Sequence, residues 1–444
     1  MPLVDIARLE RVVQETNPLL RVGHITQVVG LVMEAAGPMA RVGELCRVQP
    51  AARQETLAEV VGFRGNHMLL LPLHDHGGVE PGTRVVASGE VLQVPVGDEL
   101  LGRILDGLGR PIDGRGPLGT RRHYPVLNSA PGPMQRPRIS QPLSVGIRAI
   151  DGLVTCARGQ RMGIFSGSGV GKSTLLGMIA RNTEADVTVI ALVGERGREV
   201  RDFVDKDLGE EGLRRSVVVA ATSDCPPLMR IKAAFAATAI AEYFRDQGRD
   251  VLLMMDSLTR FAMAQREVGL AAGEPPATRG YPPSVFALLP KLLERAGTAP
   301  RGTITGFYTV LVDGDDPTEP IADAVRGILD GHVWLSRELA NRGQYPAVDV
   351  LQSVSRLMID VVDEEHYRAA EAFRSLLATY REAEDLVNIG AYAPGSNPRI
   401  DLALRLIESM WEYLRQPMGE SSQYGEARER LIQLAQAAQE GAAG

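Results

Sequence analysis

The sequence is poor in cysteine. Its 444 residues include three cysteines, at positions 46, 156 and 225. They lie far apart, without the spacing of a disulfide framework or a zinc knuckle, and so exclude both. We therefore expect free thiols and a reducing, cytoplasmic environment.

Long apolar runs and an excess of positive charge are also missing. The run 251–255 stops far short of the roughly 18 residues that span a bilayer, and charged residues interrupt 5–11, where a signal peptide would be apolar. Lys and Arg number 48 against 55 Asp and Glu, a net charge of −7. This balance argues against broad adhesion to nucleic acid or anionic membrane. We expect a soluble protein that is not exported.

The composition is otherwise that of a globular protein. Hydrophobic residues make up 44% and charged residues 23%, which excludes disorder along the whole chain. The length suggests about three domains. With 5% aromatic residues and 47 glycines, the core should be aliphatic and the turns tight.

The pattern of apolar residues in the first hundred positions changes from helical spacing to short β-rich runs near residue 20. Residues 1–20 place apolar side chains at helical spacing, which predicts an amphipathic helix, either folded back on its own domain or docked on a partner. Residues 21–95 hold short β-rich runs separated by glycine-containing turns, which predicts a small β-barrel or sandwich. The runs are 24–33, 57–63, 67–72 and 84–87. A Gly- and Pro-rich stretch, 106–142, should be an irregular link between two domains.

From 143 to 358, β-rich and helical segments alternate, which predicts βαβ units around a parallel sheet and thus an α/β fold. We expect strands at 161–165, 187–193, 216–221, 251–255 and 303–312, and helices at 172–181, 228–244 and 285–295. The tail turns helical, with breaks at Gly390 and 394–398. The domains are therefore placed at 1–20, 21–95, 96–358 and 359–444.

Residues 166–174 have the pattern of a phosphate-binding loop between a strand and a helix. The glycines let backbone N–H groups converge on phosphate oxygens, Lys172 would reach the β and γ phosphates, and the Ser173 hydroxyl can bind Mg²⁺. The consensus has Gly where this chain has Ser166, so the backbone is less free there. The expected nucleotide-binding residues are Gly167, Ser168, Gly169, Val170, Gly171, Lys172, Ser173 and Thr174.

Two carboxylates should lie at the same edge of the sheet. Asp256 ends an apolar run and is suited to hold Mg²⁺, although an Asp at this position could instead cap the next helix. Glu195 follows the strand 187–193 and could deprotonate the water that attacks the γ-phosphate. Glu199 is a rival for that role. A solvated charge cluster is the alternative for both.

Four motifs together resemble the ATPases of type III protein export, which are relatives of the rotary ATP synthase catalytic subunits. They are GIFSGSGVGKS at 163–173, VGERGREV at 193–200, DSLTRFA at 256–262 and GEPPATRGYPPS at 273–284. The likeness extends over most of the chain. Segments 311–316 and 335–340 are more similar to the flagellar branch than to the virulence injectisome branch. The resemblance implies an N-terminal β-barrel, a RecA-like P-loop ATPase core and a C-terminal helical domain.

The resemblance also implies roles for the matching residues. Lys172 and Ser173 would bind phosphate and Mg²⁺, and Asp256 would hold the metal. Glu195 would be the general base of ATP hydrolysis, and Arg196 would lie beside the γ-phosphate.

Two further residues match the family outside these motifs. Arg356 resembles the arginine finger, which reaches into the adjacent subunit's site and stabilises charge on the transferred phosphoryl group. Tyr345 resembles the tyrosine that stacks on adenine. Without the resemblance, Arg356 could be any surface arginine and Tyr345 a packed core residue.

The family further implies a homohexameric ring, with ATP between subunits, associated with the export apparatus at the cytoplasmic side of the inner membrane. There it would unload and unfold export substrates. The loop 269–284, with Glu274, Arg279 and Tyr281, would touch a coiled-coil stalk protein. The helix in 1–20 would dock a regulatory protein, and the export gate and chaperone–substrate complexes would be further partners.

Two other functions remain to be weighed. An RNA-translocating hexamer of the transcription-termination type would also carry a RecA-like core behind a small β domain. The negative charge and the lack of an aromatic and basic stacking segment in 21–95 argue against it, so no nucleic acid is expected. A non-catalytic nucleotide-binding subunit would need no general base, and Lys172, Glu195 and Asp256 together argue against that.

Overall fold

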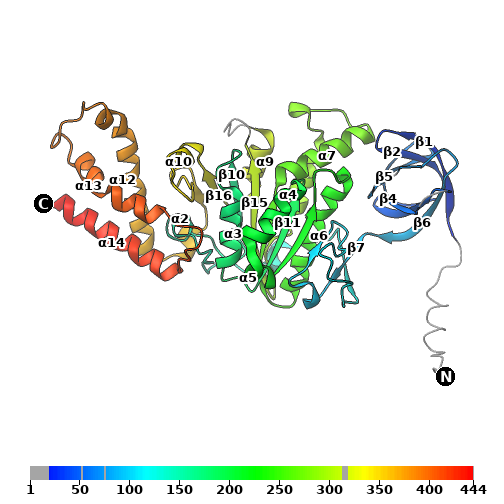
Figure 1. Cartoon of the computed structure of the whole chain (residues 1–444), viewed down its shortest axis with the longest axis horizontal. Coiled ribbons are helices and arrows are strands. Elements are labelled where there is room, and N and C mark those ends of the chain that lie inside the picture. Colours follow the sequence, from blue (N-terminus) through cyan, green and yellow to red (C-terminus); the bar gives the residue numbers. More distant parts are fainter. Residues whose placement is uncertain (1–19, 52–53, 75–76, 313–318, 444) are drawn as a thin grey trace, which may run out of the picture. The chain divides into compact units, whose positions relative to one another are not determined.

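The computed structural model describes residues 20–51, 54–74, 77–312 and 319–443 (Figure 1). The helix predicted in 1–20 lies outside the described residues, as does most of the segment 311–316. The chain forms two compact units. Of the described residues, one unit comprises those up to Leu92 together with Val268–Glu274, and the other comprises Gln93–Glu267 and those from Pro275 onward.

The first unit is a closed six-stranded barrel, which settles the choice between barrel and sandwich. Its strand order is β1-β2-β5-β4-β3-β6. The predicted run 24–33 is two strands instead of one, because the chain turns back at Gly30, whose φ is 57°. The sequence interpretation also missed β3. The strands are β1 (Val22–Val29), β2 (Val32–Ala36), β3 (Glu44–Gln49), β4 (Thr56–Arg64), β5 (His67–Pro72) and β6 (Arg84–Val91).

The Gly- and Pro-rich stretch 106–142 is mostly irregular, but the prediction that it links two domains is wrong. The division falls earlier, between Leu92 and Gln93. Strand β7 (Gln93–Val96) pairs with β9 (Arg122–Pro125), and β8 (Ile104–Leu105) joins the edge of the large sheet beside β12. The stretch therefore belongs to the second unit.

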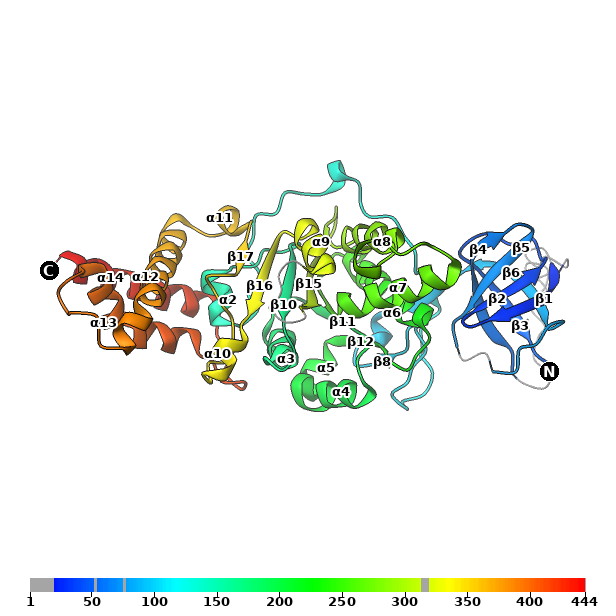
Figure 2. The same ribbon diagram turned by 90° about the horizontal axis from the view of Figure 1, so that it is seen from above.

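The second unit is built on a mostly parallel sheet of order β17-β16-β10-β15-β13-β11-β12-β8. Helices cover both of its faces, as expected for an α/β fold: Figure 2 shows α3, α4 and α5 on one side and α8 and α9 on the other. The strands are β10 (Arg161–Ser166), β11 (Val187–Val193), β12 (Ser216–Ala221), β13 (Asp250–Asp256), β14 (Gly297–Thr298), β15 (Thr303–Leu311), β16 (Gly331–Leu335) and β17 (Val354–Ser355). The short β14 pairs antiparallel with β15.

The strand order decides where the site lies. Strand β15 is inserted between β10 and β13, so the carboxyl ends of these three strands meet at one edge.

The helices of this region are α2 (Arg148–Leu153), α3 (Lys172–Asn182), α4 (Gly197–Asp202), the π-helical turn η3 (Phe203–Leu208), α5 (Gly209–Arg214), α6 (Pro227–Asp246), α7 (Leu258–Ala272), α8 (Pro283–Leu293), α9 (Pro320–Ile328), α10 (Arg337–Asn341) and α11 (Met358–Val361). Short 3-10 turns are η1 (Asp98–Leu100), η2 (Pro133–Gln135) and η4 (Thr278–Gly280).

Three helices complete the second unit: α12 (Glu364–Asn388), α13 (Pro398–Leu414) and α14 (Tyr424–Ala443). They pack on one another and on α2 through a shared apolar core that includes Phe373 and Tyr413. The buried Arg148 of α2 donates to the carbonyl oxygens of Tyr413 and Arg415. The predicted barrel, nucleotide-binding α/β core and C-terminal helices are all confirmed.

Among the described residues, no helix is both long and apolar enough to cross a membrane. The three cysteines all carry free thiols, two of them buried.

Candidate functional site

The phosphate-binding loop joins the end of β10 to the start of α3, as the sequence predicts. Gly169 and Gly171 have φ values of 79° and 87°, which side-chain-bearing residues rarely adopt. Ser166 is different, because it is the last residue of β10 in extended backbone and needs no glycine. The departure from the consensus therefore causes no strain in the loop.

Lys172, the first residue of α3, lies between two carboxylates. Its Nζ is 2.5 Å from Asp256 Oδ1 and 3.8 Å from Glu195 Oε1. Asp256 ends β13, and Glu195 follows β11. The structure thus brings together three predicted site residues from three separate segments of the chain.

Asp256 has a buried side chain, 6% exposed, that faces Lys172 instead of capping a helix. Its Oδ1 also accepts a hydrogen bond from Thr309 Oγ1 at 2.7 Å. At the start of α7, the hydroxyl of Ser257 accepts the N–H of Arg260. The carboxylate of Asp256 is therefore held at the mouth of the loop.

These oxygens suit a magnesium ion. Mg²⁺ prefers carboxylate and hydroxyl oxygens and is usually held by one or two side chains together with substrate phosphates. Asp256 and the exposed Ser173 offer such ligands. Within the described ranges, no group of three or more His, Cys, Asp or Glu residues forms a cage that could hold a metal by itself.

Glu195 is the more buried of the two candidate bases. Burial, the charge of Asp256 and the neighbouring Glu199 raise the pKa of Glu195 to about 7, against the opposing effect of Lys172. The Glu199 side chain is about half exposed, and a hydrogen bond with Glu195 lowers its pKa. A carboxyl group with a pKa near neutrality is suited to proton transfer, which favours Glu195 over Glu199.

Arg196 points toward solvent in this structure. Its side chain is 79% exposed, and Nη1 donates to Glu199 Oε1 at 3.0 Å. The structure therefore places it beside the two carboxylates with its guanidinium in an exposed ion pair.

A pocket of 560 Å³ lies on the other side of the loop, where a base could bind. Tyr345 is 48% exposed and is thus not a packed core residue; its ring carbons lie 3.4 to 3.5 Å from where a side chain on Gly171 would begin. The sequence interpretation missed the opposite wall, Arg415–Met418, because these residues are some 70 positions further along the chain. The pocket is lined by Gly169, Gly171, Thr174, Leu175, Met178, Gly343, Tyr345, Pro346, Arg415, Gln416, Pro417 and Met418.

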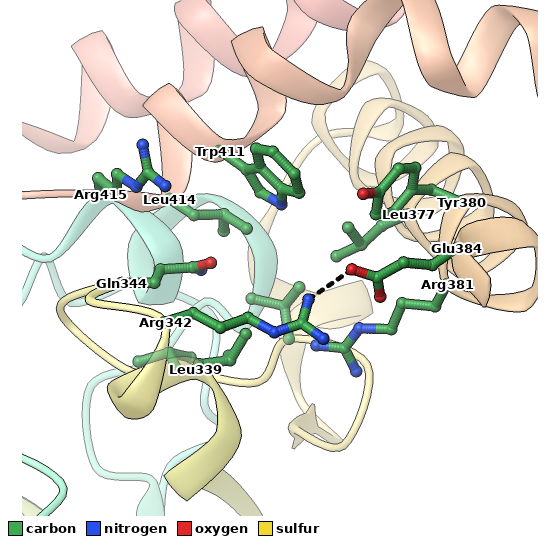
Figure 3. Close-up of a pocket in the computed structure, with 12 residues that line it drawn as sticks. Leu339, Arg342, Gln344, Leu377, Tyr380, Arg381, Glu384, Trp411, Leu414 and Arg415 are labelled. Carbon is green, nitrogen blue, oxygen red and sulfur yellow. Dashed lines mark hydrogen bonds and ion pairs between the residues drawn. The ribbon is translucent and has the colours of Figure 1, made fainter. Parts of the chain in front are cut away.

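A second cavity of 130 Å³ lies between α10, α12 and α13 (Figure 3). Trp411 and Tyr380 form part of its wall, and charged side chains line its lower side. Arg342 pairs with Glu384 at 2.6 Å, and Arg381 pairs with Asp349 at 2.9 Å. Arg342 and Arg381 are therefore paired with carboxylates within the chain, and the third arginine of the lining, Arg415, lies over the Trp411 ring at 6.0 Å.

Arg356 does not join the lysine and carboxylate cluster. It follows β17 at the edge of the sheet, where its N–H donates to Asp330 O at 3.0 Å. Its exposed guanidinium has a weak contact, 3.5 Å, with the carbonyl oxygen of Arg326. Exposure of this kind is what a residue acting on a neighbouring subunit requires.

Arg260 is a further residue at the site that the sequence interpretation did not single out. Its side chain lies over Gly194, so closely that a Cβ at Gly194 would be 2.8 Å from Arg260 Cβ. Its buried Nε has no hydrogen-bond partner in the part of the chain that the structure describes. The sequence feature that could have identified Arg260 is its position in the segment DSLTR, four residues after Asp256.

Known family models match three separate parts of the chain. Residues 146–355 match the nucleotide-binding domain of the ATP synthase alpha/beta family, residues 25–89 match the beta-barrel domain of the same family, and residues 362–433 match the T3SS EscN ATPase C-terminal domain. The phosphate loop, Glu195, Asp256 and Arg260 all fall inside the first match.

Individual relatives agree with these matches. The flagellum-specific ATP synthase of Bacillus subtilis is 54% identical over 95% of this chain and 97% of its own length. The type 3 secretion system ATPase of Xanthomonas euvesicatoria is 52% identical over 98% of both chains. The assembled ATPase EscN from the type III secretion system of enteropathogenic E. coli superposes with a TM-score of 0.89, at 47% identity, over 93% of this chain and 100% of EscN. The chain therefore belongs to the type III export ATPases, a branch of the ATP synthase alpha/beta family.

Proposed function

We propose that this chain hydrolyses MgATP at the phosphate loop and uses the reaction to assist flagellar protein export. The observation that carries the catalytic part is the cluster of Lys172, Glu195 and Asp256. A lysine, a carboxylate suited to a metal and a carboxyl group with a raised pKa meet at the mouth of one phosphate-binding loop.

Each residue has a distinct task in this proposal. The loop N–H groups and Lys172 bind the phosphates. Glu195 accepts a proton from the water that attacks the γ-phosphate in line. Arg196 turns from its exposed pair with Glu199 toward the γ-phosphate. Ser173 and Asp256 hold Mg²⁺, which when bound neutralises charge on the β and γ phosphates.

Residues outside the cluster complete the proposed site. Tyr345 stacks on the adenine ring, and Met418 and Pro417 line the opposite side of the pocket. In a homohexameric ring, Arg356 reaches the site of the adjacent subunit, in keeping with its exposed position at the sheet edge. EscN has been described as an assembled ATPase and in complex with its central stalk EscO, which supports a ring and a stalk partner here.

The other proposed partners rest on the family alone. A regulatory protein would bind the helix expected in 1–20, the loop 269–284 would contact the stalk, and the export gate and chaperone–substrate complexes would bind at the cytoplasmic side of the inner membrane. Affinity capture of the full chain and of a version without residues 1–20 tests this. The regulator should be lost with the deletion while the stalk protein is retained; loss of both, or of neither, contradicts the docking role.

The pathway is tested in the native cell. Replacing the chromosomal gene with one that encodes Lys172→Ala should stop release of flagellar subunits into the medium. A Lys206→Ala variant should not, because the Lys206 side chain is 71% exposed and pairs with Asp202 at the surface. Normal release from the Lys172→Ala strain contradicts the proposal. Secretion of virulence proteins that stops while motility persists favours the injectisome branch, which the 52% identity to the Xanthomonas relative keeps open.

A further inference from the structure

One polar side chain beside the site has no role in the scheme above. Thr309 lies on β15, the strand between the phosphate-loop strand β10 and the Asp256 strand β13. It pairs in register with Ile164 of β10, and its neighbour Tyr308 pairs with Met255 of β13. The strand order and this register together place Thr309 next to Asp256.

The hydroxyl of Thr309 has a definite orientation. Its side chain is fully buried, and Oγ1 donates to Asp256 Oδ1 at 2.7 Å. The other nearby acceptor, the carbonyl oxygen of Met255, is more distant at 3.4 Å. Since a hydroxyl has one proton and a hydrogen bond to a carboxylate is the stronger kind, the proton points to Asp256.

Asp256 Oδ1 thus has two partners, and one of them must leave. Lys172 Nζ contacts the same oxygen, but the lysine of a phosphate-binding loop binds the β and γ phosphates when nucleotide is present. The hydrogen bond from Thr309 does not involve the nucleotide and can persist.

We propose that Thr309 is a positioning residue for Mg²⁺: its hydroxyl fixes the orientation of the Asp256 carboxylate after Lys172 has moved to the phosphates. This inference rests on the proposed function, because it assumes that Asp256 holds the metal. Groups that orient a metal-binding carboxylate typically contribute 10- to 100-fold to metal affinity. The contribution should appear in Mg²⁺-dependent binding and not in binding of nucleotide alone.

Another buried threonine in the same sheet provides a matched control. Thr188 lies on β11, is fully buried, and its Oγ1 has no hydrogen-bond partner within the described residues. Thr188→Val therefore makes the same chemical change as Thr309→Val without removing a hydrogen bond. The Thr188→Val variant thus measures how ADP binding changes when a buried threonine is replaced but no hydrogen bond is lost.

The experiment measures ADP binding by fluorescence or calorimetry at a series of Mg²⁺ concentrations, and again in EDTA. Thr309→Val should raise the Mg²⁺ concentration for half-maximal gain in ADP affinity by about tenfold, with unchanged affinity in EDTA. Thr309→Ser and Thr188→Val should behave as the wild type. If Thr309→Val does not fold, the comparison of Thr309→Ser with Thr309→Ala isolates the hydroxyl in the same way.

Two outcomes overturn the inference, and they differ from a failure of the proposed function. Thr309→Val with a wild-type Mg²⁺ dependence shows that the hydroxyl does not position Asp256. Equal loss of affinity with and without Mg²⁺ shows that Thr309 supports the loop only structurally. If the wild type itself gains no ADP affinity from Mg²⁺, the metal role of Asp256 fails and the proposed function fails with it.

Discussion

Gln416 donates its backbone N–H to the carbonyl oxygen of Tyr345 at 2.9 Å. The segment after α13 is thereby attached to the tyrosine that forms one wall of the base pocket. The buried side chain of Gln416 extends this attachment, because Oε1 accepts the N–H of Arg148 and Nε2 donates to the carbonyl oxygens of Gly146 and Glu420. The C-terminal helices therefore help to shape the nucleotide site.

Gln416→Ala should weaken ATP binding and destabilise the fold. The substitution leaves buried backbone groups of Arg148 and Gly146 without a partner, at a cost of about 1–3 kcal/mol each. We expect a lower urea midpoint and a several-fold higher KM for ATP. Gln433→Ala, at an exposed position of α14, should change neither the urea midpoint nor the KM. If Gln416→Ala lowers the urea midpoint but leaves the KM for ATP unchanged, Gln416 supports the fold and does not shape the nucleotide pocket.

Glu195→Gln should abolish turnover while nucleotide binding persists. The amide keeps the size of the side chain but cannot accept the proton, and general bases contribute roughly 10²- to 10⁴-fold to rate. Steady-state phosphate release and ADP binding measure the two properties separately. Glu199→Gln is the matched control, since the rival carboxylate is expected to be dispensable; wild-type turnover by Glu195→Gln would exclude Glu195 as the base.

The pH dependence of kcat/KM should report the raised pKa of Glu195. The base acts only when ionised, so activity should fall on the acid side with an apparent pKa of about 7 in the free enzyme. Glu199 raises that pKa through its charge and its hydrogen bond, so Glu199→Ala should lower it and move the acid limb to lower pH. Glu210→Ala removes an exposed carboxylate on α5 and should leave the limb in place. A shift to higher pH in Glu199→Ala would contradict this.

The strands that were predicted well are those buried on both faces. Segments 187–193 and 216–221 are continuous apolar runs that match β11 and β12 residue for residue, because a parallel sheet covered by helices needs no polar side. The division of the run 24–33 into two strands was harder to predict, because a two-residue turn at Gly30 leaves the apolar pattern almost uninterrupted. The segment 331–335, which forms β16, was missed because it is short and starts with Gly-His.

The parts of the site that were predicted are those carried by local motifs. Lys172, Glu195 and Asp256 each follow a recognisable strand, and the common edge of a parallel sheet brings them together. Thr309 could not be found in this way, because only the insertion of β15 between β10 and β13 makes it a neighbour of Asp256. The same holds for Met418, whose place in the base pocket depends on the packing of α13.

Tyr345 should contribute to base binding through its ring alone. Most of the residues that line the pocket are apolar. The tyrosine is half exposed, so its hydroxyl group is not part of the buried core. Tyr345→Phe should therefore keep the KM for ATP, whereas Tyr345→Ala should raise it by about tenfold, in line with roughly 1–3 kcal/mol for stacking of a base on an aromatic ring. A raised KM in Tyr345→Phe would instead indicate a hydrogen bond from the hydroxyl.

Arg356 should act on the site of a neighbouring chain. Arg356→Ala and Lys172→Ala should each be inactive alone, the first for lack of charge stabilisation and the second for lack of phosphate binding. Mixed rings should recover part of the activity, because an intact Lys172 on one chain can then face an intact Arg356 on the next. As a control, Arg356→Ala chains mixed with chains carrying both substitutions contain no intact Arg356 and should stay inactive. If rings shown to be mixed by differential tagging recover no activity, Arg356 does not act between subunits, and its exposed position at the sheet edge needs a different explanation.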